Sequence, residues 1–171
     1  MKNTILFLIT GGTIDSFYDG TKDTVVPYEN SVIPKYIQSL KLYDQTEFVQ
    51  VCMKDSRAIT ANDRKQIAKT IEKSACTKVI ITHGTYTMPD TAKYLKTNLT
   101  RQDQTIVLTA AMVPHEIMNS DAPFNLGYAF SEIHHLPAGI YICMNGRVFT
   151  ADEAAKDIAQ GRFVSIFSKK S

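Results

Sequence analysis

The sequence has little excess charge of either sign and no long apolar run. Lys and Arg number 19 against 17 Asp and Glu, a formal net charge of +2, and the basic residues are scattered, so we expect no nucleic-acid partner. The first apolar run, residues 5–9, is too short for a membrane span and is followed by Gly-Gly rather than by a small-residue cleavage site. We therefore expect a cytoplasmic protein with no membrane partner.

Cysteine pairs, metal-ligand spacings and nucleotide-binding patterns are also missing. Cys52, Cys76 and Cys143 lie far apart, which predicts reduced and mostly buried thiols. The four histidines have no metal-ligand spacing, so we expect no metal and no cofactor. Neither G-x-G-x-x-G nor G-x-x-x-x-G-K-[ST] occurs, which leaves nucleotide binding at the first glycine turn a weak alternative.

The order of segments predicts an α/β fold. A length of 171 residues suits one domain, and no linker, repeat or low-complexity segment divides residues 1–171. Strands are expected at 5–9, 47–53, 78–82, 105–109 and 139–144, and helices at 32–40, 63–74, 89–99 and 125–133. We expect three layers: a mainly parallel, twisted sheet with helices on both faces.

Three segments have weaker periodicity. The polar stretch 15–30 favours a loop or a short irregular hairpin. A long loop is expected through Pro114 and Pro123. The polar tail after the last strand is expected to be partly helical.

Two threonines each follow a buried strand and a glycine. Thr13 comes after Gly11-Gly12 and Thr85 after His83-Gly84, so both are expected at the carboxyl edge of the sheet, where small ligands bind in open α/β folds. Such a site can use threonine as a nucleophile or as an activator, provided that another group removes the hydroxyl proton. The simpler alternative for Gly-Gly-Thr is a strand-to-loop turn without chemistry.

Four further residues are weaker candidates. Tyr18 lies in the polar stretch, where it can fold over the site or be an ordinary exposed tyrosine. Asp55 and Ser56 follow a strand, and they can bind a carboxylate or cap a helix. Lys156 is most simply a solvated helix residue, and a catalytic role requires that it reach Thr85.

Taken together, these motifs resemble the amino-terminal domain of bacterial L-asparaginases, and the resemblance covers nearly the whole chain. The matching segments are Thr10-Gly11-Gly12-Thr13-Ile14-Asp15, Lys54-Asp55-Ser56, Thr82-His83-Gly84-Thr85, Thr87-Met88, Thr91-Ala92, Leu108-Thr109-Ala110-Ala111-Met112, Ser120-Asp121-Ala122-Pro123-Phe124-Asn125 and Met144-Asn145-Gly146-Arg147-Val148. The chain looks most like a short, single-domain branch of this family.

The resemblance implies hydrolysis of L-asparagine to L-aspartate and ammonia. Thr13 would be the nucleophile that attacks the side-chain amide, and Tyr18 would help to move the proton. Thr85 would be the second catalytic threonine, polarised by Lys156. Backbone N–H groups near Thr85 would stabilise the oxyanion.

The same resemblance implies how the substrate and the pocket are held. Asp55, Ser56 and Gly84 would hold the α-carboxylate end of L-asparagine. In longer relatives a carboxyl-terminal domain completes the site across a subunit interface. We therefore expect this chain to form at least a homodimer.

Position 86 departs from the family pattern. Where the family has an aspartate that pairs with the catalytic lysine and binds the substrate's α-ammonium, this chain has Tyr86. Loss of that carboxylate would leave Lys156 without a counter-charge and remove a contact worth about 1.5–3 kcal/mol. The tyrosine also adds bulk where a small ligand should sit, although its phenol could accept a hydrogen bond from Lys156.

Two classes of function follow. The first is an asparaginase impaired by Tyr86, and the second is a non-catalytic, asparaginase-like protein that binds a small molecule. The enzyme is favoured because most of the family's functional positions are retained, namely Thr13, Tyr18, Ser56, Thr85 and Lys156.

Overall fold

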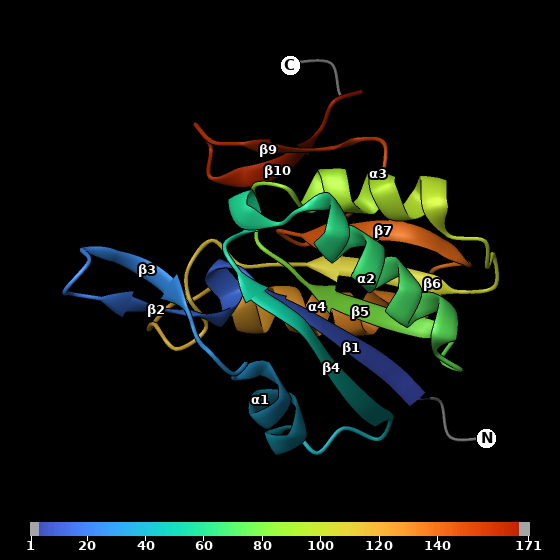
Figure 1. The fold of residues 1–171 in the computed structure, drawn as a ribbon, viewed down its shortest axis with the longest axis horizontal. Coiled ribbons are helices and arrows are strands. Elements are labelled where there is room, and N and C mark those ends of the chain that lie inside the picture. The colour runs from blue at the N-terminus through green and yellow to red at the C-terminus, as the bar shows by residue number, and fades with distance from the viewer. Residues whose placement is uncertain (1–3, 168–171) are drawn as a thin grey trace.

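A six-stranded sheet forms the centre of the computed structural model, which describes residues 4–167 (Figure 1). In spatial order its strands are β4 (Gln45–Lys54), β1 (Thr4–Gly11), β5 (Lys78–Thr82), β6 (Thr105–Thr109), β7 (Gly139–Met144) and β8 (Arg147–Thr150). The first five are parallel, and β8 pairs antiparallel with β7. The expected mainly parallel sheet is therefore confirmed.

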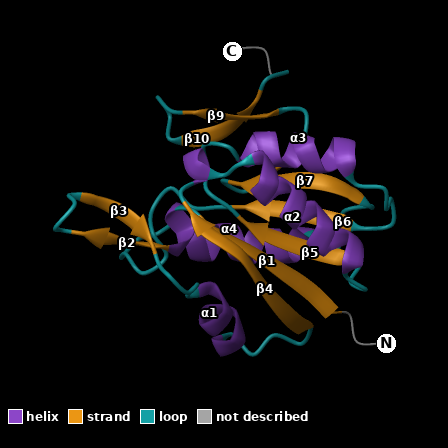
Figure 2. Cartoon of the chain, viewed as in Figure 1, coloured by secondary structure: helices purple, strands orange, loops and turns teal. Residues whose placement is uncertain are grey.

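Helices cover both faces of this sheet (Figure 2). They are α1 (Ile33–Ser39), α2 (Ala61–Lys73), α3 (Met88–Asn98) and α4 (Ala122–Glu132). Along β1, Leu6 and Leu8 join one buried cluster with α2 and α3, whereas Ile5 and Phe7 join the other with α1 and α4. Because side chains alternate across a strand, one apolar segment contributes to both cores, and the three-layer fold is confirmed.

The polar stretch 15–30 forms a hairpin, which is one of the two structures that its sequence predicts. A short 3-10 helix, η1 (Thr13–Asp15), leads into β2 (Ser16–Asp19), which pairs antiparallel with β3 (Thr24–Pro27). This hairpin projects away from the central sheet, at the left of Figure 1. Buried Asp15 then accepts hydrogen bonds from Ser31 Oγ and Val32 N, which tie η1 to the chain just before α1.

The expected helical content of the tail is wrong. After β8, the chain forms a second antiparallel hairpin of β9 (Ala154–Asp157) and β10 (Arg162–Ser165), shown in red in Figure 1. Phe149 and Phe163 are buried and their rings lie 6.5 Å apart, so the tail contributes aromatic side chains to the core. Short strands with few apolar residues leave only a weak period-two signal, which the polar composition obscured.

The start of α4 also differs from the expectation. The helix begins at Ala122, and Pro123 occupies its first turn instead of lying in a loop. The missing N–H of proline costs little there, because the first-turn N–H groups of a helix have no partner within the helix.

The carboxyl ends of β4, β1 and β5 lie next to one another. Here the direction in which successive strands are added to the sheet reverses. The chain passes from β1 to β4 on one side and then returns across β1 to β5 on the other. Gly12 has a φ of +81°, and a Cβ added to it would lie 2.4 Å from Gly84 Cα. A Cβ on Gly84 would in turn lie 2.6 Å from Ser56 Cβ. The backbone turns after β1 and β5 therefore touch each other, and the turn after β5 touches Ser56 after β4.

Replacement of Gly12 by alanine should test this contact. We expect Gly12→Ala to lower the free energy of unfolding by about 3 kcal/mol, because the added methyl group clashes with Gly84 and the positive φ disfavours a side chain. Urea denaturation followed by circular dichroism measures the change.

Gly127→Ala is the matched control. Gly127 lies inside α4, and an added Cβ there meets no atom within 4 Å. Alanine is the better helix former, so this variant should be more stable by up to about 1 kcal/mol. Equal urea midpoints for Gly12→Ala and the unmodified chain would contradict the close contact.

Candidate active site

An ion pair fixes the end of β4. Lys54 Nζ lies 2.8 Å from both carboxylate oxygens of Asp63, which also forms a capping box with Thr60 at the start of α2. Burial alone would raise the pKa of Asp63, but the bonds from Lys54 and Thr60 lower it to about 2. The segment between β4 and α2, which contains the short 3-10 helix η2 (Ser56–Ala58), is therefore anchored at both ends.

Ser56 and Asp55 are both engaged with neighbouring groups. The buried Ser56 hydroxyl accepts a hydrogen bond from Tyr86 N at 3.2 Å, and Ser56 O accepts one from Thr87 Oγ1 at 2.6 Å. The Asp55 carboxylate accepts three bonds from Arg57, namely from its backbone N, Nε and Nη2 at 2.8–3.0 Å. These bonds lower the pKa of Asp55. Ser56 is thus hydrogen-bonded to the second threonine turn, and roles in substrate binding stay predictions for both residues.

Lys156 reaches Thr85 from the carboxyl-terminal hairpin. Its Nζ donates a hydrogen bond of 2.7 Å to Thr85 Oγ1, although 71 positions separate the two residues. Lys156 lies on β9 and is half-buried, so the simple interpretation as a solvated helix residue is wrong. Burial, and then the nearby Arg57 charge, lower the pKa of Lys156, and Asp55 opposes this only in part. The lysine therefore becomes a neutral base more readily than an ordinary lysine.

Tyr86 presents its ring to two cations. Lys156 Nζ lies 3.9 Å and Arg57 Cζ 5.0 Å from the ring centroid. The Tyr86 side chain is about half exposed, at 48%. Attraction between a cation and the ring quadrupole replaces part of what a carboxylate would supply to the lysine, without adding a negative charge. The Lys156 ammonium donates its hydrogen bond to Thr85 and not to the phenol oxygen of Tyr86, the partner that the sequence also allowed.

The first threonine lies beside this cluster, and Tyr18 lies outside it. Thr13 is half-buried and follows Gly12, whose backbone touches Gly84. Tyr18 is exposed on β2, and its hydroxyl donates a 2.5 Å hydrogen bond to Asp23 in the same hairpin. That bond raises the pKa of Tyr18. The structure thus brings Thr13, Ser56, Gly84, Thr85, Tyr86 and Lys156 to one edge of the sheet, with Asp55 at its margin, and leaves Tyr18 in the projecting hairpin.

The buried His83, which was not among the candidate site residues, orients the second threonine turn. His83 Nδ1 lies 2.9 Å from Gly84 O, and its Nε2 lies 3.0 Å from Thr91 Oγ1, which accepts a bond of 3.1 Å from Arg64 Nε. A carbonyl only accepts, so Nδ1 carries the proton and Nε2 accepts from Thr91. Burial lowers the pKa of His83 to about 4, which keeps the ring neutral. The sequence signal was its place directly before Gly84-Thr85, at the end of a buried strand.

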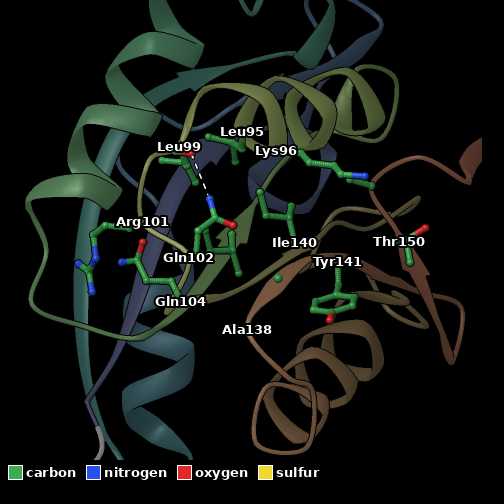
Figure 3. Close-up of a pocket in the computed structure, with 13 residues that line it drawn as sticks. Leu95, Lys96, Leu99, Arg101, Gln102, Gln104, Ala138, Ile140, Tyr141 and Thr150 are labelled. Atoms are coloured by element: carbon green, nitrogen blue, oxygen red, sulfur yellow. Dashed lines mark hydrogen bonds between the residues drawn. The ribbon is translucent and has the colours of Figure 1, made fainter.

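A separate cavity of about 260 Å³ lies at the opposite edge of the sheet (Figure 3). Leu95 and Leu99 at the end of α3 line it, together with Ile140 and Tyr141 of β7. Its lining includes none of the predicted site residues. Its two cations are paired with carboxylates, Lys96 with Asp152 and Arg101 with Asp103. The candidate chemistry therefore lies at the carboxyl edge and not in this cavity.

Within residues 4–167, no three His, Cys, Asp or Glu side chains are grouped as metal ligands. No helix there is long and apolar enough to cross a membrane. The three cysteines are unpaired, with Cys76 and Cys143 buried and Cys52 half-buried.

Comparisons with known proteins identify the family of the chain. Residues 4–166 match the family model for the N-terminal domain of asparaginases. The chain belongs to the asparaginase family. It is 27% identical over 169 residues to a glutaminase-asparaginase of Acinetobacter glutaminasificans, covering 92% of this chain and 50% of that protein. It is 32% identical over 163 residues to L-asparaginase 2 of Escherichia coli K12, covering 89% and 46%.

Solved asparaginase structures share the fold. The thermostable L-asparaginase of Thermococcus kodakarensis superposes with a TM-score of 0.82 at 24% identity, covering 97% of this chain and 52% of that one. A probable cytoplasmic L-asparaginase from Campylobacter jejuni gives 0.81 at 26% identity, covering 96% and 52%. This asparaginase-family chain therefore spans about half the length of the relatives that it matches.

The neutral state of His83 predicts a pH dependence of stability. Its pKa is about 4 in the fold against a reference value of 6.5, so the unfolded chain binds the extra proton between these values. The part of the free energy of unfolding that depends on neutral His83 is complete above about pH 6.5. It is lost as the pH falls towards 4, by about 3 kcal/mol in all. Urea denaturation at several pH values measures this slope.

The non-titrating variant His83→Gln isolates the effect. The stability difference between the unmodified chain and His83→Gln should shrink as the pH falls from 6.5 to 4. The control Thr97→Ala replaces an exposed threonine, which does not titrate, and should keep a constant difference over the same range. A constant difference for His83→Gln as well would show that His83 is not buried in its neutral form.

Proposed function

We propose that this chain is an amidohydrolase that converts L-asparagine to L-aspartate and ammonia through a threonine nucleophile. The observation that carries the proposal is the 2.7 Å hydrogen bond from Lys156 Nζ to the buried Thr85 Oγ1. A lysine with a lowered pKa beside a threonine hydroxyl is the arrangement that activates a weak nucleophile or a water molecule. Membership of the asparaginase family supports the choice of an amide substrate.

The proposed reaction has two halves. Thr13 Oγ attacks the side-chain amide carbon, its proton passes to the leaving nitrogen, and the C–N bond breaks to release ammonia. A water molecule that loses a proton through Thr85 and Lys156 then hydrolyses the ester, which restores Thr13 and forms the aspartate carboxyl group. Tyr18 is the proposed partner for the first proton transfer, and it must turn from Asp23 to act.

Substrate, oligomer and location are part of the same proposal. Ser56, Asp55 and Gly84 would hold the α-carboxylate end of L-asparagine, beside the ring of Tyr86. A homodimer or higher homo-oligomer would close the pocket, because the site has an open side on which Tyr86 is about half exposed. The similarity to a probable cytoplasmic L-asparaginase of Campylobacter jejuni supports a cytoplasmic location.

We propose further that Tyr86 impairs the enzyme. The ring occupies the space next to Lys156, and its side chain brings no carboxylate to bind an α-ammonium. The alternative function is an asparaginase-like binding protein without catalysis. The burial of Thr85, with 3% of its surface exposed, favours that alternative, because a catalytic hydroxyl must be reached by its reactant.

Removal of the proposed nucleophile should abolish turnover. We expect Thr13→Ala to lower ammonia release from L-asparagine at least about a thousandfold, because no ester can form at alanine. A coupled assay for ammonia measures the rate. Thr97→Ala, which changes an exposed threonine on α3, should keep the rate of the unmodified chain. Undiminished activity of Thr13→Ala would exclude Thr13 as the nucleophile.

A carboxylate restored at position 86 should accelerate hydrolysis. We expect Tyr86→Asp to release ammonia from L-asparagine about ten to a hundred times faster, through a charge-assisted bond to the α-ammonium. Tyr43→Asp, at a fully exposed tyrosine, should change nothing. Equal rates for Tyr86→Asp and the unmodified chain would show that Tyr86 is tolerated. If both are folded but inactive, the non-catalytic alternative is correct.

A further inference from the structure

The charged groups around Thr85 leave a net positive charge. Lys156 and Arg57 contribute two cations, and Asp55 is the one carboxylate that influences Lys156 in the described part of the chain. The three hydrogen bonds from Arg57 use both oxygens of Asp55, so this carboxylate is committed to its arginine neighbour. Lys156 is left without a carboxylate partner among residues 4–167, and it bonds to Thr85.

Two cations of the chain also lie close to the ring of Tyr86. Its face attracts cations, but Lys156 and Arg57 already lie 3.9 and 5.0 Å from its centroid. An additional ammonium group from a substrate would meet these two like charges and, among residues 4–167, no available carboxylate. A carboxylate group, in contrast, would meet two cations.

We infer that the site takes an amide that carries a carboxylate and no α-ammonium, with succinamate as its simplest member, in preference to L-asparagine. The inference rests on the proposed amide hydrolysis and assigns its substrate class. Succinamate has the same chain length and the same terminal amide as L-asparagine, and it lacks only the ammonium group. Water cleaves its C–N bond to give succinate and ammonia, so no further reactant is needed.

The first test compares ammonia release from the two amides. We expect kcat/KM for succinamate to exceed that for L-asparagine at least about tenfold with the unmodified chain, because of the like-charge repulsion of the ammonium. A higher or equal value for L-asparagine would overturn the inference and leave the proposed hydrolysis intact.

Two variants should reverse the preference by different routes. Tyr86→Asp places a new carboxylate beside Lys156, and Arg57→Gln removes the cation and its two side-chain bonds to Asp55, leaving only the bond from the backbone N–H. Both should shift the ratio of kcat/KM values towards L-asparagine. Arg147→Gln is the matched control, since Arg147 also lies over an aromatic ring, that of Phe149, but on β8. If both folded variants keep the ratio of the unmodified chain, the inference is wrong.

Binding of the two products separates this inference from the proposed function. If the unmodified chain hydrolyses neither amide, titration calorimetry with succinate and L-aspartate decides the matter. Tighter binding of succinate supports the inferred ligand class although the hydrolytic function has failed. Equal binding, tighter binding of L-aspartate, or no binding of either overturns the inference.

Discussion

The candidate site depends on the close approach of three chain segments at the carboxyl ends of β4, β1 and β5. Gly12 packs on the backbone of Gly84, and Gly84 packs on Ser56, with no room for a Cβ at either glycine. This contact sets the separation between the first and second threonine turns before any side-chain chemistry is considered. The site also lies at the topological switch point beside β1, where the strand order reverses and where ligands bind in open α/β sheets.

The sequence predicted the fold best where burial is continuous. The expected bounds of β5, β6 and β7 agree with the structure. β5 and β6 are apolar runs buried almost throughout between parallel neighbours, and β7 is buried over its last three residues. The position of the two threonine turns followed from the same argument. The contact between Lys156 and Thr85 did not, because local periodicity carries no information about a pair 71 positions apart. Only the family resemblance pointed to it, while the composition suggested a helix where β9 lies.

At position 86, one substitution can alter the charge beside Lys156 without altering the arrangement of the strand ends. An aspartate there would neutralise Lys156 directly, whereas the Tyr86 ring attracts it through its quadrupole and leaves the net charge unchanged. Arg57 adds a second cation near the same ring and holds Asp55. The consequence is electrostatic selection against an ammonium, even though the hydrogen bond between Lys156 and Thr85 is formed.

The buried and open sides of the site therefore have separate tasks. On the buried side, the hydrogen bonds of His83 to Thr91 and Gly84 fix the turn that presents Thr85, and the neutral ring adds no charge to the core. On the open side, Arg57, Tyr86 and Lys156 determine which charges a ligand can bring. Tyr86 is half exposed, and its backbone N–H, not its side chain, donates the hydrogen bond to Ser56. A new side chain at this position can therefore change selectivity while the strand ends keep their arrangement. The proposed specificity can thus change at one exposed position without loss of the hydrogen bond between Lys156 and Thr85.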